Sequence, residues 1–352
     1  MLIFEDSPLI ACPFWASAVA VCQSTLFPES ISDTEEPLPE GHLDHLRHAG
    51  LTHHLPLIPS DFTVMTRFVL SELIAYTCLD TWFVLTQHWS ASALLNGSAM
   101  TDVKLFQPCK GLIGVGYGHL RRQTACLTVN YDDQSVSVKG FAPWVTGSGW
   151  LESVVYGATD PEGMHCYIVV PHANTPSYHI EDVQRLSAVK RTDTRRVSMD
   201  VSLPISHLIK KSPSYSINHG DDMALLASTA PILGLIQRVL DDWAVDVDFD
   251  TKSPYLKWQV HADTLRSDIY NALMCIDLSS LMQRQSLRRR AHTLLEVVID
   301  TWAVVIGGRG NDVLHRTHRR RVEASFFRVF QQTSYLRAAA VSDLENHYLS
   351  VL

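Results

Sequence analysis

The sequence predicts an α+β protein with three parts: an N-terminal helical domain, a central β-barrel or β-sandwich domain, and a C-terminal helical bundle. Apolar residues recur at helical spacing between residues 61 and 95, and a series of short alternating strands separated by turn residues follows. Long helical stripes resume at Asp221 and continue toward the end of the chain. This order predicts domains at residues 1–110, 111–210 and 211–352.

Composition bounds the class of protein. A chain of 352 residues that is 46% hydrophobic can bury a sizeable core in one large domain or in two to three packed subdomains. Charged residues make up only 19%, which suggests buried subunit surface in addition to the core. The net charge of −8 disfavours nucleic-acid binding as the main role.

The compartment follows from cysteine usage and from leader and span signals. Seven scattered cysteines without a Cys-x-x-Cys pair are typical of a reducing compartment. The N-terminus has no basic segment before an apolar core, and no uninterrupted apolar run reaches the roughly 18 residues needed to span a bilayer. We therefore expect a cytoplasmic protein without a membrane span.

The first domain is the least regular part of the sequence. Prolines and acidic residues between positions 28 and 40 indicate a loop, and a short helix is expected from His42 to His48, ending at Gly50. Residues 61–95 then form two helices, with Ser60-Asp61 as the N-cap. The histidines of the short helix spiral around it, so a solvated helix is favoured over a metal site.

The central domain is built from short strands. The strand-like segments are residues 126–131, 135–139, 144–146, 153–156, 165–170, 183–190 and 194–203. The glycine-rich stretch from Gly114 to His119 resembles a phosphate loop but lacks the strand–turn–helix setting of a dinucleotide fingerprint. The C-terminal domain has helical stripes at residues 223–239, 256–274, 281–305 and 322–349.

Several motifs lie in a fixed order along the chain. They are Val138-Lys-Gly140 followed by Trp144-Val145-Thr146, the strand 192–208, the helix 232–241, and the pair Gly307-Gly308-Arg309-Gly310 and Phe330-Gln331-Gln332-Thr333-Ser334. Over about residues 45–350 this order resembles the acyl-CoA dehydrogenase family, whose fold is a helical domain, a β-domain and a helical bundle.

The resemblance implies an FAD site. Gly307, Gly308 and Gly310 match a turn that helps to bind FAD in the family. Trp144 matches an aromatic residue that packs on the flavin, and Thr146 matches a hydroxyl that hydrogen-bonds flavin N5. The resemblance also implies that Val145, between these two residues, and Thr333, in the segment Phe330–Ser334, belong to the cofactor site. Relatives are homotetramers or homodimers that share FAD across the interface, so the resemblance also implies a homo-oligomer.

Departures from the family pattern concern the chemistry. Gln331 stands at the position of the catalytic Glu, and an amide cannot take up a proton at neutral pH. Some relatives carry the base on an earlier helix instead, and that position is Ala224 here. Asp246 stands where the family has an Arg that contacts the FAD pyrophosphate. The loop that binds flavin and substrate in the family has become Gly114–Arg121.

Each of these residues also has a purely structural interpretation. Trp144 and Thr146 suit an ordinary buried strand, and the glycines at 307–310 suit a helix C-cap. Gln331 could simply bond a helix end. The basic runs 288–290 and 318–321 could bind a phosphate group of CoA or FAD, but a charged helix face is favoured.

Three functions remain open. The first is an FAD-dependent oxidoreductase of an acyl thioester, bound to CoA or to a carrier protein, in which Asp221, Asp222 or Glu323 would have to replace the missing base. The second is a flavin-dependent monooxygenase of a small metabolite, which does not need the Glu. The third is a flavin-free descendant, acting as a binding protein or a redox-neutral enzyme.

Overall fold

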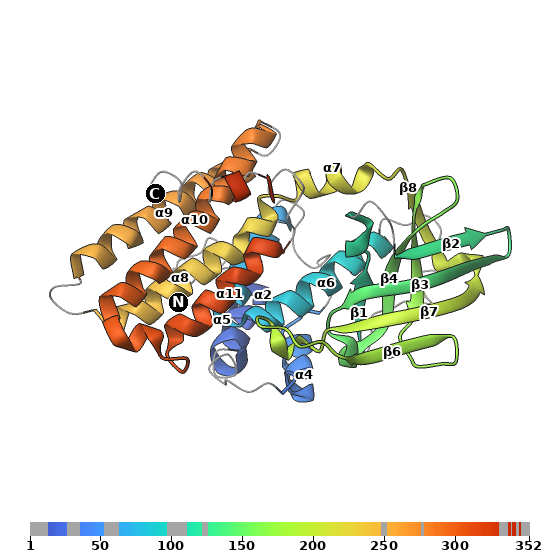
Figure 1. The fold of residues 1–352 in the computed structure, drawn as a ribbon, viewed down its shortest axis with the longest axis horizontal. Coiled ribbons are helices and arrows are strands. Elements are labelled where there is room, and N and C mark those ends of the chain that lie inside the picture. Colours follow the sequence, from blue (N-terminus) through green and yellow to red (C-terminus); the bar gives the residue numbers. More distant parts are fainter. Residues whose placement is uncertain are drawn as a thin grey trace. The chain divides into compact units, whose positions relative to one another are not determined.

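The computed structural model describes residues 13–26, 36–52, 63–96, 111–121, 126–247, 252–275, 278–330, 337–338, 340–342 and 345. The chain forms two compact units (Figure 1). The helical unit contains residues 63–79 and the described residues from Gly220 onward. The β unit contains residues 13–26, 36–52 and 80–219. The domain boundaries inferred from the sequence stay a prediction.

The helical unit is a bundle of long helices. Its members are α5 (Thr63–Thr77), α8 (Ala230–Ala244), α9 (Lys252–Met274), α10 (Leu281–Ile306) and α11 (Arg316–Val329). Local residues mark where two of the helices begin. Ser280 is the N-cap of α10, because its hydroxyl accepts from the Gln283 amide at 3.1 Å, and Pro231 lies in the first turn of α8. α7 (Ser216–Met223) and a 3₁₀ turn at Ala227–Thr229 precede α8.

Close packing holds the bundle together. α8 is buried along almost its whole length and packs against α5, while α10 packs against α8, α9 and α11. Among the described residues, the segment Leu281–Asn311 is long and apolar enough to cross a membrane by length and composition. A core helix of a bundle meets the same criterion, and α10 buries one of its faces in this way.

The β unit contains one mixed eight-stranded sheet. Its strands are β1 (Leu112–Gly116), β2 (Leu127–Tyr131), β3 (Ser135–Val145), β4 (Leu151–Thr159), β5 (His165–Pro171), β6 (Tyr178–Val183), β7 (Arg195–Pro204) and β8 (Leu208–Ser212). Their order is β6-β7-β3-β2-β4-β5-β8, and β1 pairs with β4. A single residue pair, Thr128 with Thr159, joins β2 to β4, so the sheet consists of two halves with a narrow connection.

The two halves share one core. Apolar side chains from β2, β3 and β7 form a single buried cluster with those from β4, β5 and β8. A second cluster places Ala91 and Leu95 of α6 (Leu79–Asn96) against β1, β4 and β5, so α6 covers the outer face of that half. The unit also contains α2 (Pro13–Val21), a π-turn at Cys22–Leu26 and α4 (Glu40–His48).

Most elements lie where the sequence predicted them, and the α+β class is confirmed. Some details differ. The strand expected at 183–190 is β6 at 178–183, β1, β8 and α2 were not foreseen, and α11 begins at Arg316, before the expected start at residue 322, and ends at Val329. Most of the helix expected after Phe330 lies outside the described residues. The N-cap expected at Ser60-Asp61 lies outside the described residues.

Candidate functional site

The C-terminal end of β3 presents the first group of site residues. Pro143 has no N–H to give to the ladder, and the pairing of β3 with β7 shifts between Ala142 and Val145. As a result Trp144 is 49% exposed, while Val145 and Thr146 are buried. A large aromatic side chain therefore lies open at the end of β3, next to a buried hydroxyl. The structural interpretation of Trp144 as a buried aromatic is wrong.

A tight turn follows and is held by the loop before β7. Gly147 has a left-handed backbone (φ +78°), and its amide donates to the Thr192 carbonyl at 2.8 Å. The Gly149 amide donates to Asp193 Oδ2 at 2.6 Å, and a Cβ at Gly149 would lie only 2.7 Å from that oxygen. The turn Gly147–Gly149 is thus fixed by its glycines and by Asp193, whose own φ is +45°.

Three threonine hydroxyls determine what Thr146 can do. Thr192 Oγ1 donates to the Val189 carbonyl at 2.7 Å, and Thr194 Oγ1 donates to Thr146 Oγ1 at 3.2 Å. Thr146 is therefore an acceptor toward its neighbour, and its own proton has no acceptor among the described residues. A buried hydroxyl with a spare proton can donate to a bound ligand.

A chain of four polar side chains starts at the same turn. Ser148 Oγ lies 2.7 Å from His172 Nε2, and His172 Nδ1 lies 2.6 Å from the Tyr178 hydroxyl. The Tyr178 hydroxyl lies 2.7 Å from that of Tyr156, which is fully buried. Burial lowers the pKa of His172 to about 4, although Asp193 opposes this, so the imidazole is neutral at pH 7. Burial also raises the pKa of both tyrosines.

The sequence analysis did not find this series of hydrogen-bonded side chains, because its four residues come from different elements. Ser148 follows β3, Tyr156 belongs to β4, His172 follows β5 and Tyr178 begins β6. A histidine directly after a strand and a proline was the only local signal, and it indicates a turn as readily as a site.

The glycine turn of the helical unit has a clear structural role. Gly307 ends α10 with φ +62°, which is the helix C-cap that the sequence left open as an alternative. A Cβ at Gly307 or Gly308 would meet no atom within 4 Å, whereas one at Gly310 would lie 2.7 Å from the Ala303 carbonyl oxygen. The turn therefore has open space beside its first two glycines only.

Asp246 contacts this turn. Its carboxylate accepts from Trp302 Nε1 at 3.1 Å and lies 3.4 Å from Arg309 NH1. The acid at the position of the family's arginine thus pairs with the arginine inside the Gly-Gly-Arg-Gly turn.

Gln331 and Thr333 lie outside the described residues, but the residue before them is described. The Phe330 carbonyl accepts from Arg288 NH2 at 3.2 Å. Arg288 is fully buried and also donates to Ser228 Oγ and to the Ser228 carbonyl, at 2.7 and 2.8 Å. Burial lowers its pKa to about 10, so it still carries its charge at neutral pH. The basic run 288–290 thus contains a buried structural cation.

Of the acids that could have replaced the base, Asp221 and Asp222 are half-buried residues of α7, and Glu323 is unsuited to the role. Glu323 is buried and pairs with Arg320 at 2.5 Å and Arg319 at 3.0 Å. Burial opposes ionisation, but the two arginines dominate and lower the pKa of Glu323. Ala224 is exposed and brings no acid.

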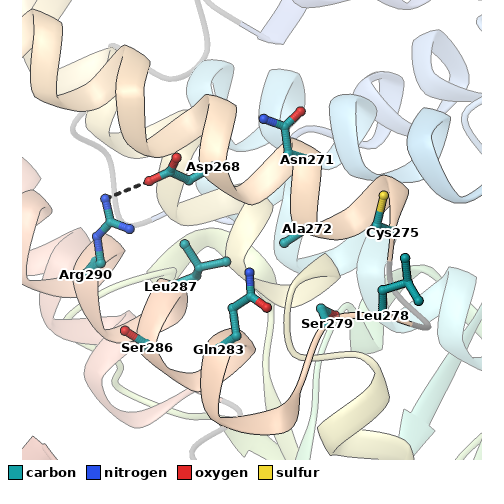
Figure 2. A pocket seen from close by; sticks show the side chains of 10 residues that line it. All are labelled: Asp268, Asn271, Ala272, Cys275, Leu278, Ser279, Gln283, Ser286, Leu287 and Arg290. Carbon is teal, nitrogen blue, oxygen red and sulfur yellow. Dashed lines mark ion pairs between the residues drawn. The ribbon is translucent and has the colours of Figure 1, made fainter.

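The bundle also has an open cavity of about 480 Å³ between α9 and the start of α10. Figure 2 shows that Asp268 and Arg290 approach each other across it, and their ion pair measures 2.9 Å. None of the residues expected to bind a cofactor or take part in catalysis lines this cavity. Among the described residues, no group of His, Cys, Asp and Glu side chains is arranged to hold a metal ion.

Comparisons with known proteins agree on the fold alone. No protein-family model and no curated protein sequence matches the chain significantly. A probable acyl-CoA dehydrogenase from Mycobacterium abscessus has 12% identity and a TM-score of 0.78, with 96% of this chain and 99% of that chain covered. Butyryl-CoA dehydrogenase from Megasphaera elsdenii has 14% identity and a TM-score of 0.76, with 94% and 96% covered. Dibenzothiophene monooxygenase from Paenibacillus sp. A11-2 has 14% identity and a TM-score of 0.74, with 94% and 97% covered.

Proposed function

We propose that this chain, which has the fold of the acyl-CoA dehydrogenases, is a flavin-dependent oxidoreductase that acts on an acyl thioester. The observation that supports this best is the pair at the end of β3. Trp144 offers an open aromatic face, and Thr146 beside it has a hydroxyl proton without an acceptor among the described residues. An aromatic surface and a neutral donor suit a flat heteroaromatic ring whose nitrogen gains charge on reduction.

Each unit by itself has residues that suit one part of FAD. In the β unit, Trp144 would cover the flavin ring and Thr146 would donate to it. In the helical unit, Gly307 and Gly308 leave open space that suits a pyrophosphate, and Arg309 supplies positive charge. Asp246 opposes an anion there, but its pairing with Arg309 offsets its charge in part. We infer that FAD binds, with the turn 307–310 in place of the usual arginine.

The proposed reaction lacks the usual proton acceptor. Gln331 has a non-titrating amide, Ala224 has no acid, and Glu323 is held ionised by two arginines. Removing a positioned general base costs on the order of 10²–10⁴ in rate. The chain therefore acts on a substrate whose α-proton is more acidic than that of a simple thioester, or it desaturates simple thioesters slowly.

A flavin-dependent monooxygenase is the second candidate. The absence of an acid at positions 224 and 331 favours it, because oxygen insertion does not begin with proton abstraction next to a thioester. The likeness to dibenzothiophene monooxygenase is compatible with this reaction. A flavin-free protein is the third candidate, and Asp246 is the residue that favours it.

We also propose a homotetramer or homodimer in the cytoplasm. Several apolar side chains of α9 and α10 are exposed, among them Val260, Met274, Met282 and Val304. Exposed apolar side chains on a bundle surface are typical of subunit contacts.

Purification of the full chain with FAD separates the three candidates. A yellow protein with bound flavin excludes the flavin-free candidate. Bleaching of the flavin by an acyl-CoA without oxygen supports the dehydrogenase, whereas oxygenated product formed with NADH and a reductase supports the monooxygenase. A colourless protein that binds no FAD would contradict the first two.

Variants then test the site itself. We expect Trp144→Ala and Thr146→Val to weaken FAD binding roughly tenfold, because each removes one ring contact. Thr128→Val on the exposed face of β2 is the matched control and should bind FAD like the wild type. Gln331→Glu should increase thioester bleaching if the missing base limits the reaction, and no increase with any acyl-CoA would count against the dehydrogenase.

A further inference from the structure

The direction of the hydrogen bonds in the Ser148–His172–Tyr178–Tyr156 chain can be worked out from proton counting. A neutral imidazole carries one N–H, and each of the three hydroxyls carries one proton. The three hydrogen bonds can run inward from Ser148, outward from Tyr156, or from both ends toward Tyr178, whose hydroxyl oxygen can accept two hydrogen bonds. The third arrangement leaves the Tyr178 proton without an acceptor among the described residues, and Tyr178 is only 2% exposed, so it carries the cost of an unpaired buried donor.

The inward direction leaves a buried proton without an acceptor. Ser148 would donate to His172 Nε2, His172 Nδ1–H to Tyr178, and Tyr178 to Tyr156. The Tyr156 proton would then have no acceptor among the described residues, and Tyr156 is 0% exposed. A buried donor without a partner carries the full cost of its lost hydration.

The outward direction satisfies the buried end. Tyr156 donates to Tyr178, Tyr178 to His172 Nδ1, and His172 Nε2–H to Ser148 Oγ. The spare proton is now that of Ser148, which is 5% exposed and lies at the turn after β3.

We propose that Ser148 is a ligand-binding hydroxyl, which the Tyr156–Tyr178–His172 chain holds as a hydrogen-bond donor toward an uncharged carbonyl oxygen or ring nitrogen of a molecule bound at the end of β3. His172, Tyr178 and Tyr156 are positioning residues, because they act only through Ser148. The identity of the ligand rests on the proposed function, whereas the direction of the hydrogen bonds does not.

The charge around Ser148 selects the kind of acceptor. The Ser148 amide donates to the Asp193 carbonyl at 3.0 Å, and the Asp193 carboxylate accepts from the next amide, that of Gly149. An anion beside Ser148 would meet this carboxylate, which Arg195 balances at 2.7 Å. Two uncharged acceptors fit, a carbonyl of the flavin ring and the thioester carbonyl of the substrate.

Thr146 and Ser148, two residues apart, then each present a hydroxyl donor. Thr146 and Ser148 each end a separate hydrogen-bond network, and each keeps a spare hydroxyl proton. Thr146 is fixed through Thr194, and Ser148 is fixed through His172. Two oriented donors on one turn bind a rigid acceptor with little loss of side-chain entropy.

The first test determines the direction of the hydrogen bonds between Ser148 and Tyr156. Full-length protein labelled with ¹⁵N-histidine is examined at pH 7 by long-range proton–nitrogen correlation, and the His172 signals are assigned by their loss in His172→Gln. The inference requires the Nε2–H tautomer. The Nδ1–H tautomer would overturn it, because Ser148 would then donate into the chain.

The second test reads the ligand. FAD, and then butyryl-CoA in the presence of FAD, are titrated into the wild type, Ser148→Ala and Tyr178→Phe. Ser148→Ala should weaken one of the two bindings roughly three- to tenfold, and which one identifies the acceptor. Tyr178→Phe frees the imidazole to turn, so it should weaken the same binding less, and it should have no effect on top of Ser148→Ala.

The controls separate failure of this inference from failure of the proposed function. Ser137→Ala removes an exposed hydroxyl from the same strand β3 and should leave both bindings unchanged. A wild type that binds FAD and butyryl-CoA no better than Ser148→Ala would overturn the inference alone. A wild type that binds neither molecule would overturn both the proposed function and the ligand assigned here.

Discussion

Gly234 of α8 lies against the main-chain carbonyl of Glu72 on α5. A Cβ built at position 234 would lie 2.2 Å from that oxygen and 2.9 Å from the Tyr76 amide nitrogen. Both are backbone atoms, so neither can rotate away. The two helices therefore approach more closely at this point than any side chain would allow.

Gly234→Ala should consequently destabilise the protein although alanine is the better helix former. We expect the free energy of unfolding to fall by roughly 1–3 kcal/mol, the usual cost of overpacking. Urea denaturation measures the change. Gly220→Ala in α7, where a Cβ meets no atom within 4 Å, should instead leave the stability equal or slightly higher. Equal stability of Gly234→Ala and the wild type would contradict the close helix crossing.

The buried carboxylate of Glu72 gives a second prediction. Glu72 is 0% exposed, accepts from Arg266 Nε at 2.8 Å, and also bonds the Tyr270 hydroxyl. Glu72→Ala leaves a buried guanidinium short of its partner and should cost about 3–5 kcal/mol in thermal or chemical unfolding. Asp263 pairs with the same arginine at 3.2 Å but is largely exposed, so Asp263→Ala should cost under about 1 kcal/mol. Similar losses in the two variants would show that burial is not what matters.

Stability should also depend on two partly buried histidines. Burial lowers the pKa of His172 to about 4 and, together with Arg288 and Arg328, that of His292 to about 3, from an ordinary 6.5. Between these values and pH 6.5 the unfolded chain binds protons that the folded chain does not. The free energy of unfolding should therefore rise with pH from about 4 to 6.5, by a few kcal/mol, and these groups should add nothing further above it.

His292→Leu isolates one of these contributions. His292 Nε2 is buried without a hydrogen-bond partner among the described residues, so an apolar side chain of similar size removes its titration at little cost. Denaturation curves between pH 4 and 7 should become flatter in this variant, whereas exposed His219→Gln should keep the wild-type slope. An unchanged slope in His292→Leu would contradict a neutral His292 in the folded protein.

The glycine turn after α10 allows its two roles to be separated. Gly307 has φ +62°, so Gly307→Ala should cost about 1 kcal/mol of stability through backbone strain. Gly308 has an ordinary φ and open space around it, so Gly308→Ala should leave stability unchanged. If FAD occupies that space, Gly308→Ala should still weaken FAD binding. Full FAD affinity in a stable Gly308→Ala would indicate that the turn is a helix cap only.

The helices and most strands could be predicted because their periods of apolar residues are local. β6 was placed several residues too late because the loop before β7 contains apolar Leu186, Ala188 and Val189. These residues precede a 3₁₀ turn at Lys190–Thr192, whose Arg191 amide donates to Asp80 Oδ1 at 3.2 Å, a partner over a hundred residues away. The local pattern of apolar residues does not indicate this contact with Asp80.

The candidate site was predictable to a similar degree. Trp144 and Thr146 were found because a motif joins them within one strand, and the family fold they implied is confirmed. Ser148, His172 and Tyr178 meet only after three different strands have paired, so no spacing along the chain could reveal them. The roles of all these residues in cofactor binding stay predictions.

The interleaved path of the chain has a consequence for biosynthesis. α5 leaves the ribosome early, yet its partner α8 is made only after the whole β unit. Residues 68–77 of α5 are buried in the finished protein and consist largely of apolar side chains. During synthesis this helix has to wait for α8 with its apolar surface uncovered, which makes nascent chains prone to aggregation and dependent on chaperones. Chains that stop after residue 219 should therefore accumulate as insoluble material.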